Sequence, residues 1–171
     1  MDTLESIFTR RSIRKFTDAP VSDEDVNLLL RAAMSAPSAR NAQPWHFIVV
    51  RDQAMREGIA RINPHAQMAL HAPVCVVVCA NLAEEKIPGY WPQDCAAAVQ
   101  NMLLAARAQD IGTVWTGVYP REERVQGAKE LFGLPDTVMP LAIIVIGHPA
   151  QPFSTQDRFD VQKIHYERWE R

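Results

Sequence analysis

Four cationic side chains and a hydroxyl lie within seven residues near the amino end of the chain, in the segment Arg10-Arg11-Ser12-Ile13-Arg14-Lys15-Phe16. A guanidinium presents a planar fork of N–H donors that fits a phosphate, and a serine hydroxyl adds a donor to the same oxygens. Crowded cations repel one another, so we expect an anion near them in the folded protein. Two hypotheses stay open on this segment alone: a phosphate anchor for a cofactor, or a solvated basic turn with acidic neighbours such as Glu5 and Asp18.

A second polar segment, Ser35 to Trp45, combines small and amide side chains with two prolines. Small side chains let a ligand approach the backbone closely. Asn41 and Gln43 supply amides that could bond a ligand, or could fix the loop through ordinary turn hydrogen bonds. Both interpretations of these amides remain open at this point.

Several motifs with known chemistry do not occur in the chain. There is no G-x-G-x-x-G, no G-x-x-x-x-G-K-[ST], no G-x-S-x-G and no H-E-x-x-H. Their absence argues against a Rossmann dinucleotide site, a P-loop, a hydrolase nucleophile elbow and a zinc protease. Cys75 and Cys79 lie in an apolar run and read as core residues rather than metal ligands. If the protein is an enzyme, a bound cofactor therefore carries the chemistry.

Composition indicates one globular domain over residues 1–171, with 47% hydrophobic residues and a formal net charge of −2. A pI near 6.2 gives no reason to expect nucleic acid as a partner. No apolar run approaches the length that spans a bilayer, so we expect no membrane association. The acidic segment Met1–Glu5 does not resemble a signal peptide, and three cysteines are an odd number. We expect a cytoplasmic protein.

Hydrophobic periodicity then predicts the elements that must hold the two polar segments in place. Helices are expected over residues 3–8, from 23 to before Pro37 behind a Ser22 capping box, from Asp52 to about 62, over 93–109 with Gly112 as the stop, and from Pro120 to about 133. Strands are expected over residues 45–50, 74–80, 113–119 and 141–146. Buried strands separated by helices indicate a mixed α and β fold.

Two segments point to contacts beyond one chain. The helix over residues 93–109 is apolar nearly all round, as in helices buried against another subunit. The last stretch, from Gln151 to Arg171, is polar with scattered aromatic residues. A tail of this kind lacks a core of its own and usually packs on something else.

Taken in order along the chain, these segments resemble the FMN-dependent nitroreductase family. The resemblance rests on Arg10-Arg11-Ser12-Ile13-Arg14, on Ala36-Pro37-Ser38-Ala39-Arg40-Asn41-Ala42-Gln43-Pro44-Trp45, on Gly112-Thr113-Val114-Trp115-Thr116-Gly117, and on Gly147-His148-Pro149 with Asp157-Arg158-Phe159. It implies an α+β fold with a central mixed or antiparallel sheet flanked by helices. It also implies an interlocked homodimer with two FMN sites at the interface, and two-electron transfer from NADH or NADPH to a nitroaromatic, a quinone or a similar small-molecule acceptor.

For the phosphate, the resemblance implies that Arg10, Arg11 and Ser12 hold the phosphate and ribityl chain of FMN, with Arg158 as a second phosphate ligand. The family often has another basic residue two positions earlier, where this chain has Gln156. Arg14 would face the N1 and O2 edge of the ring. Reduction places negative charge on that edge, so a fixed cation there stabilises reduced flavin.

For the ring, the resemblance implies a lining contributed by both subunits. In the family, the segment corresponding to Pro37, Ser38 and Ala39 comes from the partner subunit. A backbone N–H of the Trp115 to Gly117 segment faces flavin N5 in the family, and Gly117 has no side chain to block that approach. The remaining residues that the resemblance implies near the ring are Asn41, Gln67, Trp115 and Thr116.

No side chain stands out as a catalytic nucleophile or base, and the function expected is NAD(P)H-dependent, FMN-linked oxidoreduction by alternating half-reactions in one slot. The loop from Asn81 to Pro92, with Tyr90 and Trp91, is the expected lid over the acceptor. Two alternatives remain. The protein could be a flavin-binding carrier or sensor with little turnover, or a structural dimerisation module without a cofactor, in which the arginine cluster is solvated.

Overall fold

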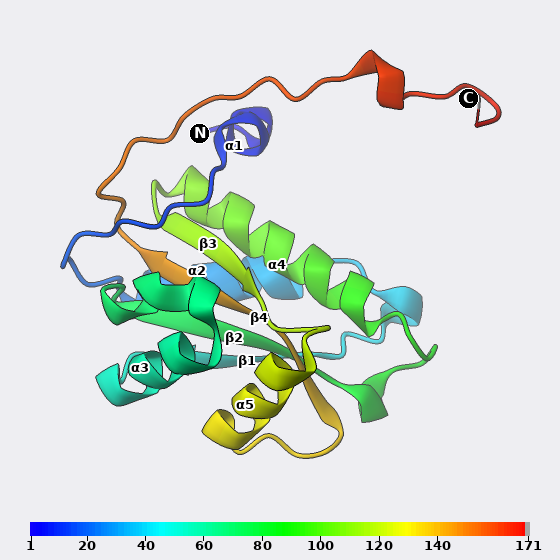
Figure 1. The fold of residues 1–171 in the computed structure, drawn as a ribbon. Coiled ribbons are helices and arrows are strands. Elements are labelled where there is room, and N and C mark those ends of the chain that lie inside the picture. Colours follow the sequence, from blue (N-terminus) through cyan, green and yellow to red (C-terminus); the bar gives the residue numbers. More distant parts are fainter. Residues whose placement is uncertain (170–171) are drawn as a thin grey trace.

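A four-stranded antiparallel sheet forms the centre of the computed structural model, which describes residues 1–169 (Figure 1). The strands run in the order β1-β2-β4-β3, and every neighbouring pair is antiparallel. Their bounds are Trp45–Val50 for β1, Val74–Asn81 for β2, Gly112–Gly117 for β3 and Val138–Gly147 for β4. The expected α+β fold is confirmed, with an antiparallel sheet.

Helices cover both faces of the sheet. Figure 1 shows α2 (Asp23–Met34) and α4 (Trp91–Ala108) on one face, and α3 (Gln53–Ile62) and α5 (Glu122–Phe132) on the other. The first helix, α1 (Thr3–Thr9), lies apart from the sheet and beside α4. Within residues 1–169, none of the helices combines the length and apolar character needed to cross a membrane.

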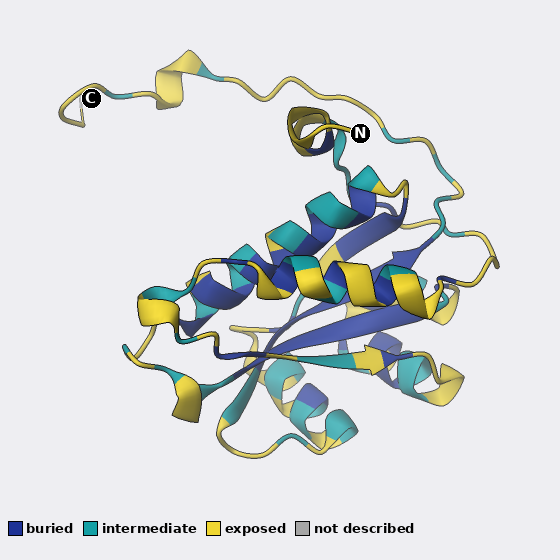
Figure 2. Ribbon diagram, turned by 180° about the vertical axis from the view of Figure 1, so that it is seen from behind, coloured by how far each residue is buried: buried dark blue, intermediate teal, exposed yellow. Residues whose placement is uncertain are grey.

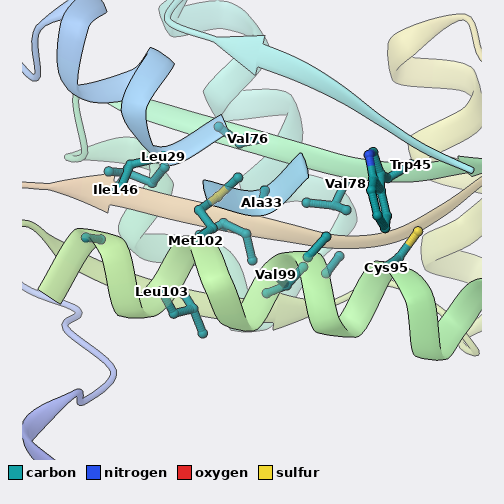
Figure 3. Close-up of a cluster of buried hydrophobic side chains, with 14 of the residues drawn as sticks. Leu29, Ala33, Trp45, Val76, Val78, Cys95, Val99, Met102, Leu103 and Ile146 are labelled. Carbon is teal, nitrogen blue, oxygen red and sulfur yellow. The ribbon is translucent and has the colours of Figure 1, made fainter. Parts of the chain in front are cut away.

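The alternation of side chains along the strands creates two hydrophobic cores. Val76 and Val78 of β2 point toward α2 and α4, where they meet Val99 and Met102 (Figure 3). The side chains between them in sequence, such as Val77, point toward α3 and α5. Both faces of β2 and β4 are therefore buried, which explains why these strands read as continuous apolar runs.

Short polar side chains start the helices where the sequence predicts. Asp2, Ser22 and Asp52 each accept a hydrogen bond from the backbone N–H three residues later, at 2.8, 3.0 and 2.9 Å. Each bond satisfies one of the N–H groups that an α-helix leaves free in its first turn. At the other end of α5, Gly133 adopts a left-handed φ of 62° and ends the helix as expected.

The prediction that Gly112 ends the long helix is wrong. The helix α4 stops at Ala108, and Asp110 takes the left-handed conformation, with φ of 53°. Gly112 instead begins β3, where a Cβ atom would lie 2.8 Å from Ile13 Cγ2 and 3.1 Å from the Gly147 carbonyl oxygen. Glycine is needed here because the basic segment crosses β3 too closely for a side chain.

The tail leaves the body of the molecule after β4 and runs outward in an extended path past α1 (Figure 1). Nearly all of it is exposed, as Figure 2 shows. Phe159, Tyr166 and Trp169 have exposed fractions of 77%, 77% and 81%. The tail thus makes no core with its own chain up to residue 169, and the last two positions of the expected tail lie outside the described residues.

Gly112→Ala should lower the free energy of unfolding by about 1–3 kcal/mol, because the added methyl group must displace Ile13 or the backbone of Gly147. Urea denaturation followed by circular dichroism measures the change. Gly117→Ala is the matched control on the same strand, since its Cβ would meet nothing nearer than the Tyr119 carbonyl oxygen at 4.0 Å. Equal losses in the two variants would contradict this account of Gly112.

Candidate functional site

A groove of about 660 Å³ separates the end of α1 from the tail. The first wall comes from Ile7, Phe8, Arg10 and Arg11, and the second from residues 155–159. The structure thus brings Arg158 to Arg10 and Arg11, although it lies almost 150 positions after them in the sequence. The Arg11 guanidinium also donates to the Gln156 carbonyl oxygen at 3.3 Å and so joins the two walls.

The groove concentrates positive charge. Partial burial, and then the neighbouring Arg11 and Arg158 cations, lower the pKa of Arg10 below its ordinary value. The buried Nε of Arg11 has no hydrogen-bond partner within residues 1–169. A buried N–H that is left unsatisfied is costly, and so is the mutual repulsion of clustered cations. An anion with several oxygen acceptors, such as a phosphate, removes both costs.

Gln156 departs from the basic residue expected two positions before Arg158, and the structure shows what it does instead. Its Oε1 accepts hydrogen bonds from Nε and Nη2 of Arg158, at 3.3 and 3.1 Å. The amide therefore orients the Arg158 guanidinium without adding a charge.

The exposed edge of β3 begins beside this groove. Ser12 forms a parallel bridge with Thr113, and the Ile13 N–H donates to the Thr113 carbonyl at 2.9 Å on the side away from β4. Backbone groups of alternate residues point the same way in a strand, so Trp115 and Gly117 also present their N–H groups to this edge. From Thr113 to Gly117 the edge extends roughly 13 Å, at about 3.3 Å per residue.

Two side chains, the buried Asn63 and the half-buried Arg124, fix the far end of this edge. Asn63 Nδ2 and Arg124 Nη1 both donate to the Gly117 carbonyl, at 3.2 and 3.0 Å. Thr116 points its hydroxyl into the sheet, where it donates to the Ile143 carbonyl at 2.8 Å. The hydroxyl of Thr116 is thus already used within the sheet. An elongated ligand with a phosphate at one end could lie along this edge from the groove.

Known proteins share the sequence pattern and the fold of this chain. The family model for the nitroreductase family matches residues 7–74 and 63–148. The chain belongs to the nitroreductase family.

Three relatives show how far the similarity extends. A Methanothermobacter thermautotrophicus protein, provisionally named NADH dehydrogenase/NAD(P)H nitroreductase, is 50% identical over 99% of this chain and 88% of its own. An NAD(P)H-dependent FMN reductase of Bacillus subtilis is 28% identical over 97% of this chain and 73% of its own. A crystal structure from Desulfovibrio desulfuricans, of a provisionally assigned nitroreductase in complex with FMN, superposes with a TM-score of 0.86, at 35% identity and 99% coverage of both chains.

The polar segment from Ala36 to Trp45, part of the resemblance to the nitroreductase family, forms a strained loop before β1. Arg40, Asn41 and Gln43 all have positive φ, at 50°, 53° and 51°. Side chains other than glycine rarely adopt this conformation, and such strain is often found at functional sites. The Asn41 and Gln43 side chains bond one another at 2.8 Å, and Ser38 Oγ accepts from the Gln43 N–H at 3.0 Å. The amides thus fix the turn within this chain.

Residues outside the loop hold this strained backbone in place. Asp94, on α4, accepts a hydrogen bond from the Ala39 N–H at 2.9 Å. Lys86 Nζ donates to the carbonyls of Arg40 and Asn41, at 3.2 Å each. Asp94 is 5% exposed, and its second carboxylate oxygen has no hydrogen-bond partner among the described residues.

The remaining predicted site residues lie elsewhere. Gln67 is on the short 3-10 helix η2 (Pro64–Leu70), where its amide donates to the Ala60 carbonyl at 2.7 Å. Trp115 is 36% exposed on β3. Arg14 is exposed, and its backbone N–H donates to Gln151 Oε1 at 3.1 Å. Whether these side chains contact a flavin stays a prediction.

The expected lid loop is shorter than the sequence indicated. The helix α4 begins at Trp91, two residues before the predicted start, because proline fits the first turn of a helix, where Pro92 lies. Trp91 is buried and packs edge-on against Tyr119, with ring centroids 4.8 Å apart. It is therefore a core residue, while Tyr90 remains exposed.

Sequence reasoning missed Asn63, Lys86, Asp94 and Arg124. Each side chain bonds a backbone group elsewhere in the chain. Every residue except proline carries the same backbone groups, so no spacing of residue types could reveal these contacts. The one available signal was Asn63 before Pro64, which predicts a cap: its Oδ1 accepts from the His65 N–H at 3.0 Å. That signal says nothing about its second contact, to Gly117.

The three cysteines form part of the cores and do not form a reactive site. Burial raises the pKa of Cys75 and of Cys79 to about 12. Burial, and then the nearby Asp94 carboxylate, also raises the pKa of Cys95 to about 12. Within residues 1–169, no cluster of three or more His, Cys, Asp or Glu side chains could hold a metal ion.

Because a thiolate forms only as pH approaches the thiol pKa, these thiols should stay protonated and unreactive at pH 8. We expect none of the three to react with a disulfide reagent such as DTNB in the native protein over an hour, and all three to react after unfolding in guanidinium. Absorbance of the released thiolate measures the count. Rapid native reaction of any cysteine would contradict the burial of these thiols.

Proposed function

We propose that the protein is an FMN-dependent oxidoreductase that passes two electrons from NADH or NADPH to a small-molecule acceptor such as a nitroaromatic or a quinone. The observation that carries the proposal is the groove in which Arg10, Arg11 and Arg158 converge, with a buried Arg11 N–H that has no partner in the described part of the chain. The flavin reductase of B. subtilis and the FMN complex from D. desulfuricans, both similar along nearly the whole chain, support the assignment of the ligand.

In this proposal, the chain's own residues divide the binding of FMN among themselves. Arg10, Arg11 and Arg158 hold the phosphate, and Ser12 adds a hydroxyl donor next to them. Arg14 supplies a positive charge to the pyrimidine edge of the ring. When bound there, FMN supplies the capacity to accept two electrons as a hydride and to release them again.

The open edge of β3 supplies the groups next to the reacting face. The N–H groups of Trp115 and Gly117 are available because β3 is an edge strand beyond its bridge to Ser12. Asn63 and Arg124 hold the Gly117 carbonyl, one peptide unit after this N–H, and so fix the end of the edge. No dinucleotide-binding motif occurs in the chain, so we propose that nicotinamide and acceptor occupy one slot in turn.

A complete site requires a second copy of the chain. The loop that carries Pro37 and Ala39 precedes β1, while the proposed ring site lies at β3, on the opposite edge of the sheet. Along α4, the contact of Asp94 with this loop and the Arg107 contact with α1 are 13 residues apart, or roughly 20 Å. One chain therefore does not bring the loop to its own groove. We propose a homodimer in which each loop completes the partner's site.

A flavin carrier with little turnover remains the second candidate, because it would use the same phosphate groove. The two functions differ in whether reduced nicotinamide can reach the flavin. They are separated by a kinetic measurement rather than by binding.

The purified full-length protein should be yellow, with flavin absorbance near ~450 nm that survives desalting and bleaches within seconds when NADH or NADPH is mixed in a stopped-flow instrument. Addition of menadione or nitrofurazone should then restore the absorbance. Mixing with NAD⁺ or NADP⁺ is the control and should leave the spectrum oxidised. Flavin that binds but stays oxidised at saturating reduced nucleotide would favour the carrier, and a protein that takes up no FMN would exclude both functions.

Tyr166 and Trp169 should contribute to the proposed dimer, since both are exposed aromatic side chains on a tail that makes no core with its own chain. We expect Tyr166→Ser combined with Trp169→Ser to weaken dimerisation about tenfold or more, because buried aromatic side chains dominate interface energies. Sedimentation velocity at micromolar concentration measures it. Leu70→Ser, at an exposed apolar position on η2 with 39% exposure, is the control. A wild-type protein that sediments as a monomer would contradict the dimer itself.

A further inference from the structure

Arg107 is an arginine buried at the end of α4, with only 9% of its surface exposed. Arginine is rarely buried unless its charge is paired. Neither a sequence motif nor the proposed electron-transfer chemistry accounts for it, and it does not line the groove. Its contacts therefore need an explanation of their own.

The guanidinium makes three contacts, to segments from three parts of the chain. Its Nε donates to Thr9 Oγ1 at 2.9 Å. Its central carbon lies 4.1 Å from the centre of the Phe153 ring, in a cation–π contact. It also pairs with Asp110, just after α4. One side chain thus joins the end of α1, the end of α4 and the start of the tail.

Two of these contacts are immediate neighbours of the groove. Thr9 is the last residue of α1 and directly precedes Arg10, which lines the first wall. Phe153 lies two positions before Thr155, where the second wall begins. The spacing between the walls, and so between Arg10 and Arg158, depends on how firmly these two segments are held together.

The two walls of the groove must be held together by other contacts because they carry like charges. Repulsion among Arg10, Arg11 and Arg158 acts to separate the end of α1 from the tail whenever no anion lies between them. The second wall is exposed along residues 154–159 and gains little from burial. Segments with few buried side chains open at low free-energy cost.

We propose that Arg107 is a positioning residue for the phosphate groove, which it preorganises by clamping Thr9 and Phe153 at a fixed distance. This inference rests on the proposed binding of FMN and adds to it a determinant of the preference for a phosphorylated flavin. Preorganisation raises affinity by removing the cost of ordering the two walls when the ligand binds. Only the phosphate spans both walls, so the clamp acts on FMN and not on riboflavin, which has the same ring and ribityl chain without the phosphate.

The test compares the affinities of FMN and riboflavin for the full-length protein freed of flavin, by quenching of flavin fluorescence. Phe153→Leu removes the aromatic face but keeps an apolar side chain, and it leaves Arg107 with Thr9 and Asp110. We expect it to weaken FMN binding about tenfold and to leave riboflavin binding unchanged, so that the preference for FMN falls by the same factor. Phe153→Tyr, which keeps the ring, should retain the wild-type preference.

Two further variants serve as a positive and a negative control. Arg158→Gln removes a proposed phosphate ligand and should also lower the preference for FMN. Phe132→Leu makes the same aromatic-to-aliphatic change on α5, on the other face of the sheet, and should leave the preference unchanged.

The outcomes separate the clamp from the proposed function. If Phe153→Leu weakens FMN and riboflavin equally, the residue has a general structural role and the clamp is wrong. If the wild type prefers FMN and Phe153→Leu keeps that preference, the clamp is also wrong while the flavin site stands. If the wild type itself shows no preference for FMN, the phosphate groove is not the site, and the proposed function fails with it.

Discussion

Repulsion among three guanidinium groups is the constraint on which the rest of this structure depends. Arg10, Arg11 and Arg158 are brought to one groove by segments from the two ends of the chain. Like charges at short range are unfavourable unless an anion is bound or the surrounding structure holds them. The hydrogen bond from Arg11 to the Gln156 carbonyl and the contacts of Arg107 hold the end of α1 to the tail against this repulsion, while the Gln156 amide orients Arg158. A site that is organised before its ligand arrives binds that ligand more tightly.

The strand β3, which starts next to the groove, adds backbone N–H donors to the charges of the groove. Gly112 has no side chain, so the basic segment can cross β3 closely enough for Ser12 to pair with Thr113. That bridge covers the first part of the β3 edge and, within residues 1–169, leaves the N–H groups of Trp115 and Gly117 open. The cluster of guanidinium groups and these N–H groups therefore meet at one corner of the sheet. A flat ligand with a phosphate tail suits that combination better than a small anion would.

The sequence predicted the elements well because local rules decide them. Capping by Ser22 and Asp52 and the apolar runs of β2 and β4 are local features, so their patterns are visible in the chain itself. Gly112 was misread because a glycine after a helix predicts a stop, whereas the actual demand on it comes from Ile13, 99 positions earlier. For the same reason, no pattern disclosed the contacts of Arg107 with Thr9 or of Asp94 with Ala39. The groove arginines were found because their cluster is local, while their companion Arg158 came from resemblance to a family.

The strain in the loop before β1 bears on the proposed homodimer. Three consecutive or nearly consecutive side-chain-bearing residues with positive φ each cost free energy, of the order of 1 kcal/mol or more. Asp94 and Lys86 offset part of this cost from outside the loop, and the groove lies at the other end of α4, so the loop does not reach the groove of its own chain. A backbone held in one shape, next to a buried carboxylate oxygen that has no partner within residues 1–169, is well suited to meet another molecule. In the proposed homodimer that molecule is a second copy of the chain, and the strain would serve to complete the partner's groove.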